Sequence, residues 1–267
     1  MLGSRTLEVD YSNRVAIVIP SLGQHMYLLE RAVKSVQSQQ HKPLILLVFP
    51  RSENHLIDFC QSRELQYILD DGQGFMKAYN QAIQHLKKLG IEIFGSIGDD
   101  DELLQGAIAG LVTAFDQESV VASVGHCWYI NSEGKVIFHN KSRTWILPLM
   151  HFLPDLMPAP GALFTISAWE KVGGFSTEYR FASDYDFWLK IRKKGKVKRV
   201  EVPMSLFRWH SGGLTGNNRR NARMEAKIIR RNHSSLLVRP ILVASELMFN
   251  ALGEFVLKNS MKKDYRI

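Results

Sequence analysis

Three consecutive carboxylates, Asp99, Asp100 and Asp101, are the residues of this sequence whose types and spacing most clearly indicate chemistry. They follow an apolar run over 91–97, typical of a buried strand, and precede an apolar run over 103–111, typical of a helix. Adjacent like charges repel each other unless a cation neutralises them. Ligands bind at the carboxyl ends of strands in open α/β sheets, and oxygen ligands suit Mg²⁺ or Mn²⁺, so we predict a metal site. Acids also stabilise a helix N-terminus, but two would be enough for that.

A second pair of acids, Asp184 and Asp186, lies beside Trp188 in a segment whose apolar residues have helical spacing. Ser183 or Asp184 can cap this helix, because both side chains accept hydrogen bonds from backbone N–H groups. Capping accounts for one acid and leaves the other unexplained. Residues two apart on a helix diverge by about 200° around its axis, so only one of the two carboxylates can face a substrate.

The elements that must position these acids alternate between strands and helices in the first half of the chain. Short apolar runs predict buried strands at 15–20, 44–49, 65–69 and 91–97, and helical spacing predicts helices at 28–39, 55–63 and 75–89. Such alternation with short loops predicts a parallel, doubly wound α/β sheet with a nucleotide-binding crevice at the strand ends.

The second half of the chain has a different pattern. Strands are predicted at 120–130, 135–139, 160–166, 197–202 and 207–210, and the first two form a hairpin. A helix is predicted after Ser167, which has Glu170 at the spacing of a capping box. Residues 142–158 are predicted to form an irregular loop over the site.

Composition limits the classes of function. The chain has 267 residues, enough for one large α/β domain or for a domain with an appendage. Its net charge of +8 favours an anionic partner such as a nucleotide, a nucleic acid or an acidic lipid surface. Cys60 and Cys127 have no metal-ligand spacing and indicate free thiols in a reducing compartment. Neither a signal peptide in 1–13 nor a spanning helix is expected, which predicts a cytoplasmic location.

In combination, these segments resemble family 2 of the glycosyltransferases, which have the GT-A fold. The matching motifs occur in the family's order at 15–21, 74–80, 99–107, 173–175, 182–189 and 208–210. The resemblance implies a Rossmann-like, mostly parallel central sheet flanked by helices in residues 1–216, with a nucleotide-binding half (14–110) and an acceptor-binding half (111–216). It implies transfer of a sugar from a nucleotide diphosphate donor to an acceptor hydroxyl with inversion, in polysaccharide or glycoconjugate synthesis.

The resemblance also implies roles for single residues. Asp184 matches the catalytic base. The implied donor-binding residues are Pro20, Ser21, Asn80, Asp99 and Asp100, and the implied metal ligands are Asp100, Asp101 and His210. A Mn²⁺ or Mg²⁺ ion bridging the phosphates neutralises the leaving group, and inversion requires a base within hydrogen-bond reach of the acceptor hydroxyl. A lone His after a Trp is also often structural, so His210 keeps both interpretations.

Two positions depart from the family pattern. After the second strand, residues 50–53 are Pro-Arg-Ser-Glu, where the family has an acidic pair that contacts the nucleotide base. We therefore expect Asp70 or Asp71 to recognise the base of a UDP-sugar, or the donor to be of another type. Gly98 stands where the family often has an acid, which leaves the register of the Asp-x-Asp metal motif open within 99–101.

The tail, residues 217–267, lies outside the resemblance. Its basic residues Arg219, Arg220, Arg223, Lys227, Arg230 and Arg231 are predicted to lie on a helix that Pro240 breaks. Residues 241–257 are amphipathic and too charged to span a membrane. One interpretation is a helix packed on the domain or in a homodimer. The other is peripheral attachment to an anionic membrane, on its inner face.

Two other classes of function compete with the enzyme. A non-catalytic nucleotide-sugar-binding or scaffold protein could have the same fold, but the acid cluster and Asp184 argue against it. A nucleic-acid-binding protein is suggested by charge alone, and it is disfavoured because the basic tail lacks interleaved aromatic residues. The expected partners are therefore a UDP-sugar and an acceptor that is a glycan, a lipid-linked molecule or a small molecule.

Overall fold

The computed structural model describes residues 14–117, 119–141, 144–152, 157–209 and 218–244. The first half consists of β1 (Val15–Pro20), α1 (Met26–Gln37), β2 (Leu44–Pro50), α2 (Asn54–Gln61), β3 (Gln66–Asp70), α3 (Phe75–Lys88) and β4 (Ile93–Ser96). Its strands pair in parallel in the order β3-β2-β1-β4. The parallel, doubly wound arrangement predicted for this half is confirmed.

Strand β1 shows why these runs are continuously apolar. Val15, Ile17 and Ile19 belong to the cluster of buried side chains that includes α1 and α2. Ala16 and Val18 point to the other face and belong to the cluster that includes α3. Both faces are covered, so alternation with polar residues would bury polar groups. Each fully buried aliphatic side chain of this size contributes about 1.5–3 kcal/mol.

The second half is a mixture of elements. It contains β5 (Glu102–Leu103), α4 (Ala107–Val112), η1 (Thr113–Asp116), β6 (Val120–Ile130), β7 (Val136–Asn140), η2 (Thr144–Leu149), β8 (Ala162–Thr165), α5 (Ile166–Lys171), α6 (Ser183–Ile191), β9 (Lys196–Arg208), α8 (Arg219–Asn232) and η3 (Leu236–Val238). Strand β8 is antiparallel to β4 and β6, β7 to β6, and β5 to β9. Among the described strands of this half, only the pair β6–β9 is parallel, so this part of the sheet is mixed.

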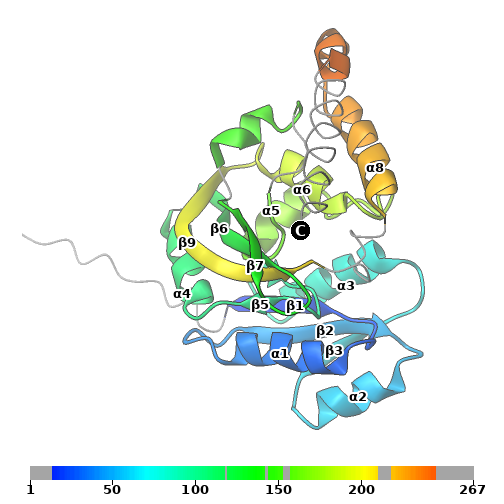
Figure 1. Cartoon of the computed structure of the whole chain (residues 1–267), viewed down its shortest axis with the longest axis vertical. Coiled ribbons are helices and arrows are strands. Elements are labelled where there is room, and N and C mark those ends of the chain that lie inside the picture. Colours follow the sequence, from blue (N-terminus) through cyan, green and yellow to red (C-terminus); the bar gives the residue numbers. More distant parts are fainter. Residues whose placement is uncertain (1–13, 118, 142–143, 153–156, 210–217, 245–267) are drawn as a thin grey trace, which may run out of the picture.

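Within the described residues, the nine strands form one curled sheet in the order β3-β2-β1-β4-β8-β6-β9-β5, with β7 beside β6. Figure 1 shows α1 and α2 on one side of this sheet and α3, α5 and α6 on the other. The buried side chains of α3 and α6 share one hydrophobic cluster, and those of α1 and α4 share another. The mixed α/β architecture with flanking helices agrees with the predicted fold class.

Two predictions for the strands were wrong. The acids do not lead directly into a helix, because Glu102 and Leu103 form β5 by pairing with β9, and α4 begins only at Ala107. The strands predicted at 197–202 and 207–210 are one strand, β9, which follows β6 over most of its length through several register shifts. Partner strands supply hydrogen bonds that a single segment does not reveal, and they override local pattern.

Two predictions for helix ends were also wrong. The N-cap of α5 is Thr165, whose hydroxyl accepts a hydrogen bond from the Ala168 N–H, and not Ser167. Helix α8 ends at Asn232, well before Pro240, and residues 239–244 are helical again. Proline is tolerated in a first helical turn because the N–H groups there have no intrahelical partner.

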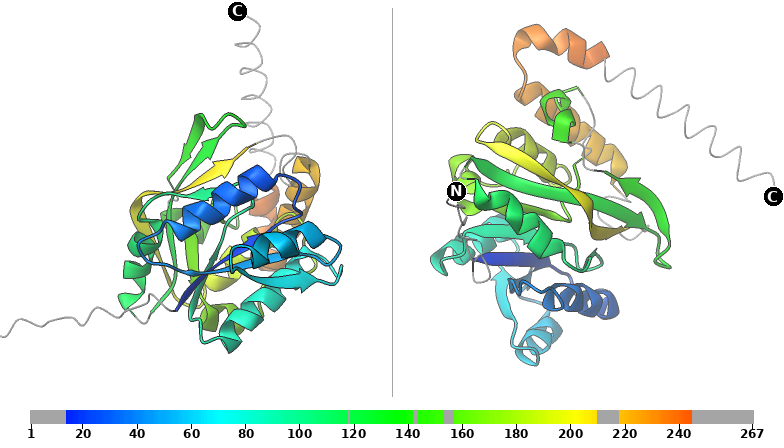
Figure 2. Two further views of the ribbon diagram at one scale, coloured as in Figure 1. Left: turned by 90° about the horizontal axis from the view of Figure 1, so that it is seen from below. Right: turned by 90° about the vertical axis from the view of Figure 1, so that its left-hand side faces the viewer.

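Helix α8 confirms the predicted basic helix in the tail. Figure 2 shows it at the end of the molecule opposite to α2. No helix among the described residues is both long and apolar enough to cross a membrane.

Cys60 and Cys127 are buried free thiols, as predicted. Residues 210–217 and 245–257 lie outside the described residues, and the division into a domain at 1–216 and a tail stays a prediction.

Candidate active site

The predicted acid cluster lies in the loop between β4 and β5, at the carboxyl end of β4. The neighbouring strand β1 ends at Pro20, and the hydroxyl of Ser21 donates a hydrogen bond to Asp99 Oδ2 at 2.6 Å. The Ser21 N–H in turn bonds to Val48 O of β2 at 2.9 Å. Burial raises the pKa of Asp99, although the Ser21 hydroxyl opposes this shift. Pro20, Ser21 and Asp99 thus lie together at the carboxyl ends of β1 and β4.

The side chain of Asp101 holds this loop in place through two hydrogen bonds. Its side chain is buried, Oδ2 accepts the Gly98 N–H at 3.1 Å, and Oδ1 accepts the Arg208 N–H at 2.9 Å. Burial, and then the charge of Asp100, raise the pKa of Asp101 to about 8. The carboxylate therefore closes the loop on itself and joins it to the end of β9.

Gly98 lies against the side chains of the acid cluster. A Cβ atom at this position would lie 2.8 Å from Asp100 Oδ1, closer than real Cβ contacts, and 3.0 Å from Asp101 Oδ2, tighter than most of them. Glycine therefore lets the chain turn tightly around the two carboxylates. This leaves Asp99 against Ser21 and Asp101 against backbone N–H groups, with Asp100 between them.

The structure gives Arg208 a role that its place in the 208–210 motif did not predict. Its buried guanidinium donates to Asp100 O at 3.1 Å and pairs with Glu102 Oε1 at 3.1 Å. It also donates to the carbonyl oxygens of Asn131 and Ser132 in the hairpin turn, at 3.2 and 3.3 Å. Arg208 therefore connects the acid loop to the β6–β7 hairpin. The feature of the sequence that could have indicated this role is a basic residue between two aromatic residues, Phe207 and Trp209.

Helix α6 places Asp184 in its first turn. Asp184 is partly buried, and its Oδ1 accepts the Tyr185 N–H at 2.9 Å. Burial raises the pKa of this carboxyl, and the Tyr185 N–H opposes the shift. The predicted capping role was wrong for both candidates, because the N-cap is Ala182 and the Ser183 hydroxyl donates to Ser176 O. Glu225 of α8 accepts the N–H groups that precede the helix.

Asp186 has two basic partners. Its Oδ1 lies 2.7 Å from His233 Nε2, and its Oδ2 lies 2.6 Å from Lys190 Nζ. Burial alone would raise the pKa of Asp186, but the hydrogen bonds from His233 and Lys190 outweigh burial and lower it. Asp186 is therefore a structural carboxylate between α6 and the end of α8.

Asn80, predicted to bind the donor, is engaged by the protein itself. Its Nδ2 donates to Phe175 O at 2.8 Å. Its Oδ1 accepts hydrogen bonds from Phe175 N at 3.0 Å and from Trp169 Nε1 at 3.2 Å. The side chain thus holds the segment after α5 against α3. These bonds use Oδ1 and one of the two Nδ2 N–H groups, and the donor-binding role of Asn80 stays a prediction.

Asp71 follows the carboxyl end of β3, on the same side of the parallel strands as Ser21. It is exposed and forms an ion pair with Arg51, with 3.0 Å between Asp71 Oδ1 and Arg51 Nη2. The neighbouring Asp70 accepts the Gly72 N–H and shapes the turn. Of the two candidates for base recognition, Asp71 is therefore the one with an exposed carboxylate. His210 lies outside the described residues.

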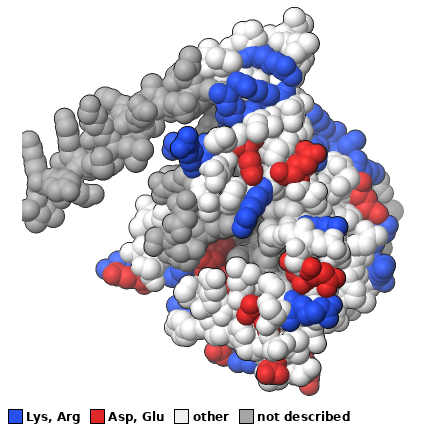
Figure 3. Space-filling model, turned by 90° about the vertical axis from the view of Figure 1, so that its right-hand side faces the viewer, with Lys and Arg blue, Asp and Glu red and all other residues white. Residues whose placement is uncertain are grey.

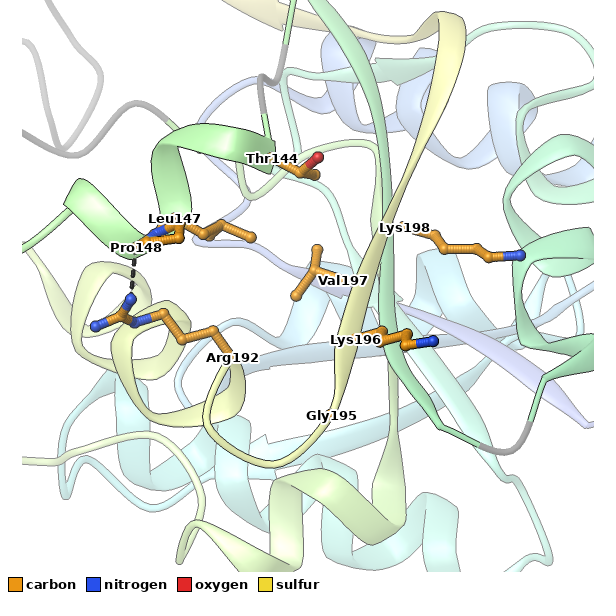
Figure 4. Close-up of a pocket in the computed structure, with 8 residues that line it drawn as sticks. All are labelled: Thr144, Leu147, Pro148, Arg192, Gly195, Lys196, Val197 and Lys198. Carbon is orange, nitrogen blue, oxygen red and sulfur yellow. Dashed lines mark hydrogen bonds between the residues drawn. The ribbon is translucent and has the colours of Figure 1, made fainter.

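A cavity of about 460 Å³ lies away from these acids, between η2 and the start of β9. Figure 4 shows Val197 and Leu147 pointing into it, while Lys196 and Lys198 point to the other face of β9. Arg192 crosses one side and donates to Leu147 O at 2.7 Å. The residues lining it include no carboxylate, so the cavity is not the site of the predicted chemistry.

Comparisons with known proteins identify the family and the fold. The sequence model described as Glycosyl transferase family 2 matches residues 16–172. The chain belongs to this family. Uncharacterized glycosyltransferases of Rickettsia typhi and Rickettsia prowazekii are each 23% identical to it over 203 residues. The match covers 70% of this chain and 61% of each relative, so this family 2 member spans about three fifths of their length.

Solved structures show the same fold. S. aureus TarS 1–349 in complex with UDP has a TM-score of 0.59 at 11% identity, over 82% of this chain and 65% of that one. The complex of TarS with UDP-GlcNAc has a TM-score of 0.57 at 13% identity, over 75% and 60%. The family match ends at residue 172, so Asp184, Arg208 and Glu225 of this family 2 chain lie beyond it.

Proposed function

We propose that this protein transfers a sugar from a nucleotide diphosphate donor to an acceptor hydroxyl, with inversion at the anomeric carbon. The observation that carries the proposal is the position of Ser21, Asp99 and Asp100 at the carboxyl ends of two adjacent parallel strands. Ligands bind at such strand ends in α/β sheets. The TarS structures with UDP and UDP-GlcNAc support a UDP-sugar as donor.

The residues present suit a divalent cation. Among the described residues, no three His, Cys, Asp or Glu side chains are grouped to hold a metal by themselves. Mg²⁺ commonly binds one or two carboxylates together with substrate phosphates, and Mn²⁺ accepts the same oxygen ligands. Asp99 and Asp100 match that donor set, while Asp101 braces the loop; His210 is proposed as a further ligand. When bound, the ion neutralises charge on the departing diphosphate.

At the acceptor end, Asp184 is the proposed general base. Its carboxylate takes the proton of the acceptor hydroxyl as that oxygen attacks the anomeric carbon. The bond to the diphosphate breaks on the opposite face, and its electron pair leaves with the diphosphate. Because burial raises the pKa of Asp184, its ionised form is a stronger base than an exposed aspartate.

A test of this function measures UDP release from a panel of UDP-sugars, with Mn²⁺ or Mg²⁺, and UDP binding in parallel. We expect metal-dependent release that EDTA abolishes. Full turnover in EDTA would contradict the metal proposal. Binding of UDP-sugars without release, with or without glycan, lipid-linked and small-molecule acceptors, would favour a non-catalytic nucleotide-sugar-binding protein.

The exposed side chains of α8 support a proposal about the class of acceptor. The outward stripe of this helix carries Arg220, Arg223, Met224, Lys227, Ile228 and Arg231, all exposed. Beyond it, Leu236 is 73% exposed and Leu237 is 90% exposed in η3. Glu225 is the only acid among residues 218–244, and it faces inward. Figure 3 shows Lys and Arg gathered at this end of the molecule.

Cationic and apolar side chains on one exposed surface are complementary to anionic lipid. We therefore place an anionic bilayer on the outer face of α8 and η3, and we propose that the acceptor is lipid-linked. This choice favours the membrane interpretation of the tail over the homodimer.

A further inference from the structure

The backbone before the first turn of α6 is held by a side chain from the tail. Glu225 Oε1 accepts the Arg180 N–H at 3.0 Å, and Oε2 accepts the Phe181 and Ala182 N–H groups at 2.7 and 2.9 Å. Backbone N–H groups shielded from water require an acceptor, and the Ala182 N–H, at the N-cap of α6, also has no intrahelical partner. Here a carboxylate more than forty residues later in the chain provides the acceptor, and hydrogen bonds to a charged acceptor are stronger than neutral ones.

The inner face of α8 makes two more polar contacts with the same region. Asn232 Nδ2 donates to the Tyr179 hydroxyl at 3.0 Å, and His233 Nε2 lies 2.7 Å from Asp186 Oδ1. Ile229, fully buried between Glu225 and Asn232, belongs to the hydrophobic cluster that contains the core side chains of α6. Helix α8 therefore contacts the chain on both sides of Asp184.

The position of Asp184 depends on this backbone. Its carboxylate bonds to the N–H of Tyr185, which belongs to the same helical turn. The carboxylate consequently moves with the first turn of α6, and that turn is anchored two residues earlier by Glu225. We propose that Glu225 is the positioning residue of the general base, so that the tail helix is part of the catalytic apparatus. This inference rests on the function proposed above.

The charged groups around Asp184 determine how its pKa responds when Glu225 is replaced. On α6, Asp186 and Lys190 pair with each other, and His233 of α8 joins that pair. In the loop before α6, the Arg180 guanidinium lies over the Phe181 ring. The negative charge of Glu225 raises the pKa of Asp184 in addition to burial, which is the larger cause. Removing that charge should therefore lower the pKa of Asp184.

The experiment compares Glu225→Gln with the wild type in steady-state UDP release, with the UDP-sugar and acceptor that are active in the panel described above, from acid to neutral pH. We expect kcat to fall roughly 10- to 100-fold, as for a small misplacement of a catalytic group. We also expect the acid limb of the kcat profile to move to lower pH, while the Kd for UDP stays unchanged. Glu170→Gln is the matched control, because Glu170 is on the surface of α5 and pairs with Lys87.

Two further variants separate the outcomes. Glu225→Asp keeps the charge, so kcat should fall without movement of the acid limb, and this variant replaces Glu225→Gln if the latter does not fold. Asp184→Asn tests the base itself. If Asp184→Asn is inactive but kcat and the acid limb of both Glu225 variants equal the wild type, the positioning role is overturned. If Asp184→Asn keeps full turnover, the proposed function fails instead.

Discussion

At the scale of the residue, three adjacent aspartates have three different environments. Asp99 bonds to Ser21, Asp101 is enclosed by backbone N–H groups, and Asp100 lies between them. Solvation and hydrogen bonding set these differences, which identical side chains in a row do not reveal. We therefore propose Asp99 and Asp100 as the donor and metal contacts within the register that the sequence leaves open.

Replacing Asp100 by Ala or Asp99 by Asn should abolish transfer and leave the fold intact, because neither change removes buried apolar contacts and Asn keeps an acceptor for the Ser21 hydroxyl. Mn²⁺-dependent UDP binding measured by calorimetry should weaken, and the melting temperature of the free protein should stay close to that of the wild type. Asp116→Ala, an exposed acid in η1, is the control. Normal Mn²⁺-dependent transfer by both variants would show that the metal binds elsewhere.

Asp184→Asn should reduce kcat by roughly 10²–10⁴-fold, the usual contribution of a general base, with little change in donor affinity. Asparagine keeps the size of the side chain and its hydrogen bond to Tyr185 N–H but removes basicity. Asp186→Asn should retain turnover, because the Asp186 side chain is directed to His233 and Lys190. An inactive Asp186→Asn beside an active Asp184→Asn would reverse the two assignments.

At the scale of the element, one buried arginine links the acid loop, the β6–β7 hairpin and β5. Arg208 donates from Nε and both Nη atoms to separate acceptors, a geometry that lysine cannot reproduce. Arg208→Lys should lower the free energy of unfolding by about 1–3 kcal/mol, since buried carbonyl groups lose their donors. Urea titration measures this loss. Lys196→Arg, an exposed residue at the start of β9, is the control, and equal loss in both would contradict the role of Arg208.

The contact between α6 and α8 should weaken in acid. The pKa of Asp186 is lowered in the folded state, so its contribution to stability is present above the unfolded-state pKa of about 4. The contribution is lost as pH falls through the lower folded-state pKa. Asp186→Asn should therefore lose stability at neutral pH and show a smaller decrease between neutral and acid pH. Parallel pH profiles of unfolding free energy for wild type and variant would contradict this.

At the scale of the whole molecule, α8 has two faces with different tasks. Its inner face binds the segment around Asp184, and its outer face presents cations and apolar side chains at one end of the protein (Figure 3). The proposed catalytic site and the proposed lipid surface therefore share one helix. This arrangement would hold a lipid-linked acceptor near the base.

Vesicle binding tests that surface. The wild type should sediment with phosphatidylglycerol vesicles and much less with phosphatidylcholine vesicles, and high salt should release it because surface charges are screened. Replacing Leu236 and Leu237 by Ser should reduce binding and spare turnover of a soluble acceptor. Ile137→Ser, an exposed residue of β7, is the control. No binding by the wild type, with a concentration-dependent dimer that the double variant loses, would favour the homodimer.

The sequence by itself determined the first half of the fold and the place of the acids. Apolar runs such as 15–20 and 44–49 are local signals of strands buried on both faces, and short connections force them into a parallel sheet. Only the tertiary structure decided what each polar side chain does. Across long sequence separations, Arg208 donates to Asp100 O and Asn80 donates to Phe175 O. Glu225 likewise accepts the N–H groups of residues 180–182. Such pairs depend on strand register and helix packing, because hydrogen bonds require a distance of about 3 Å that no local pattern encodes.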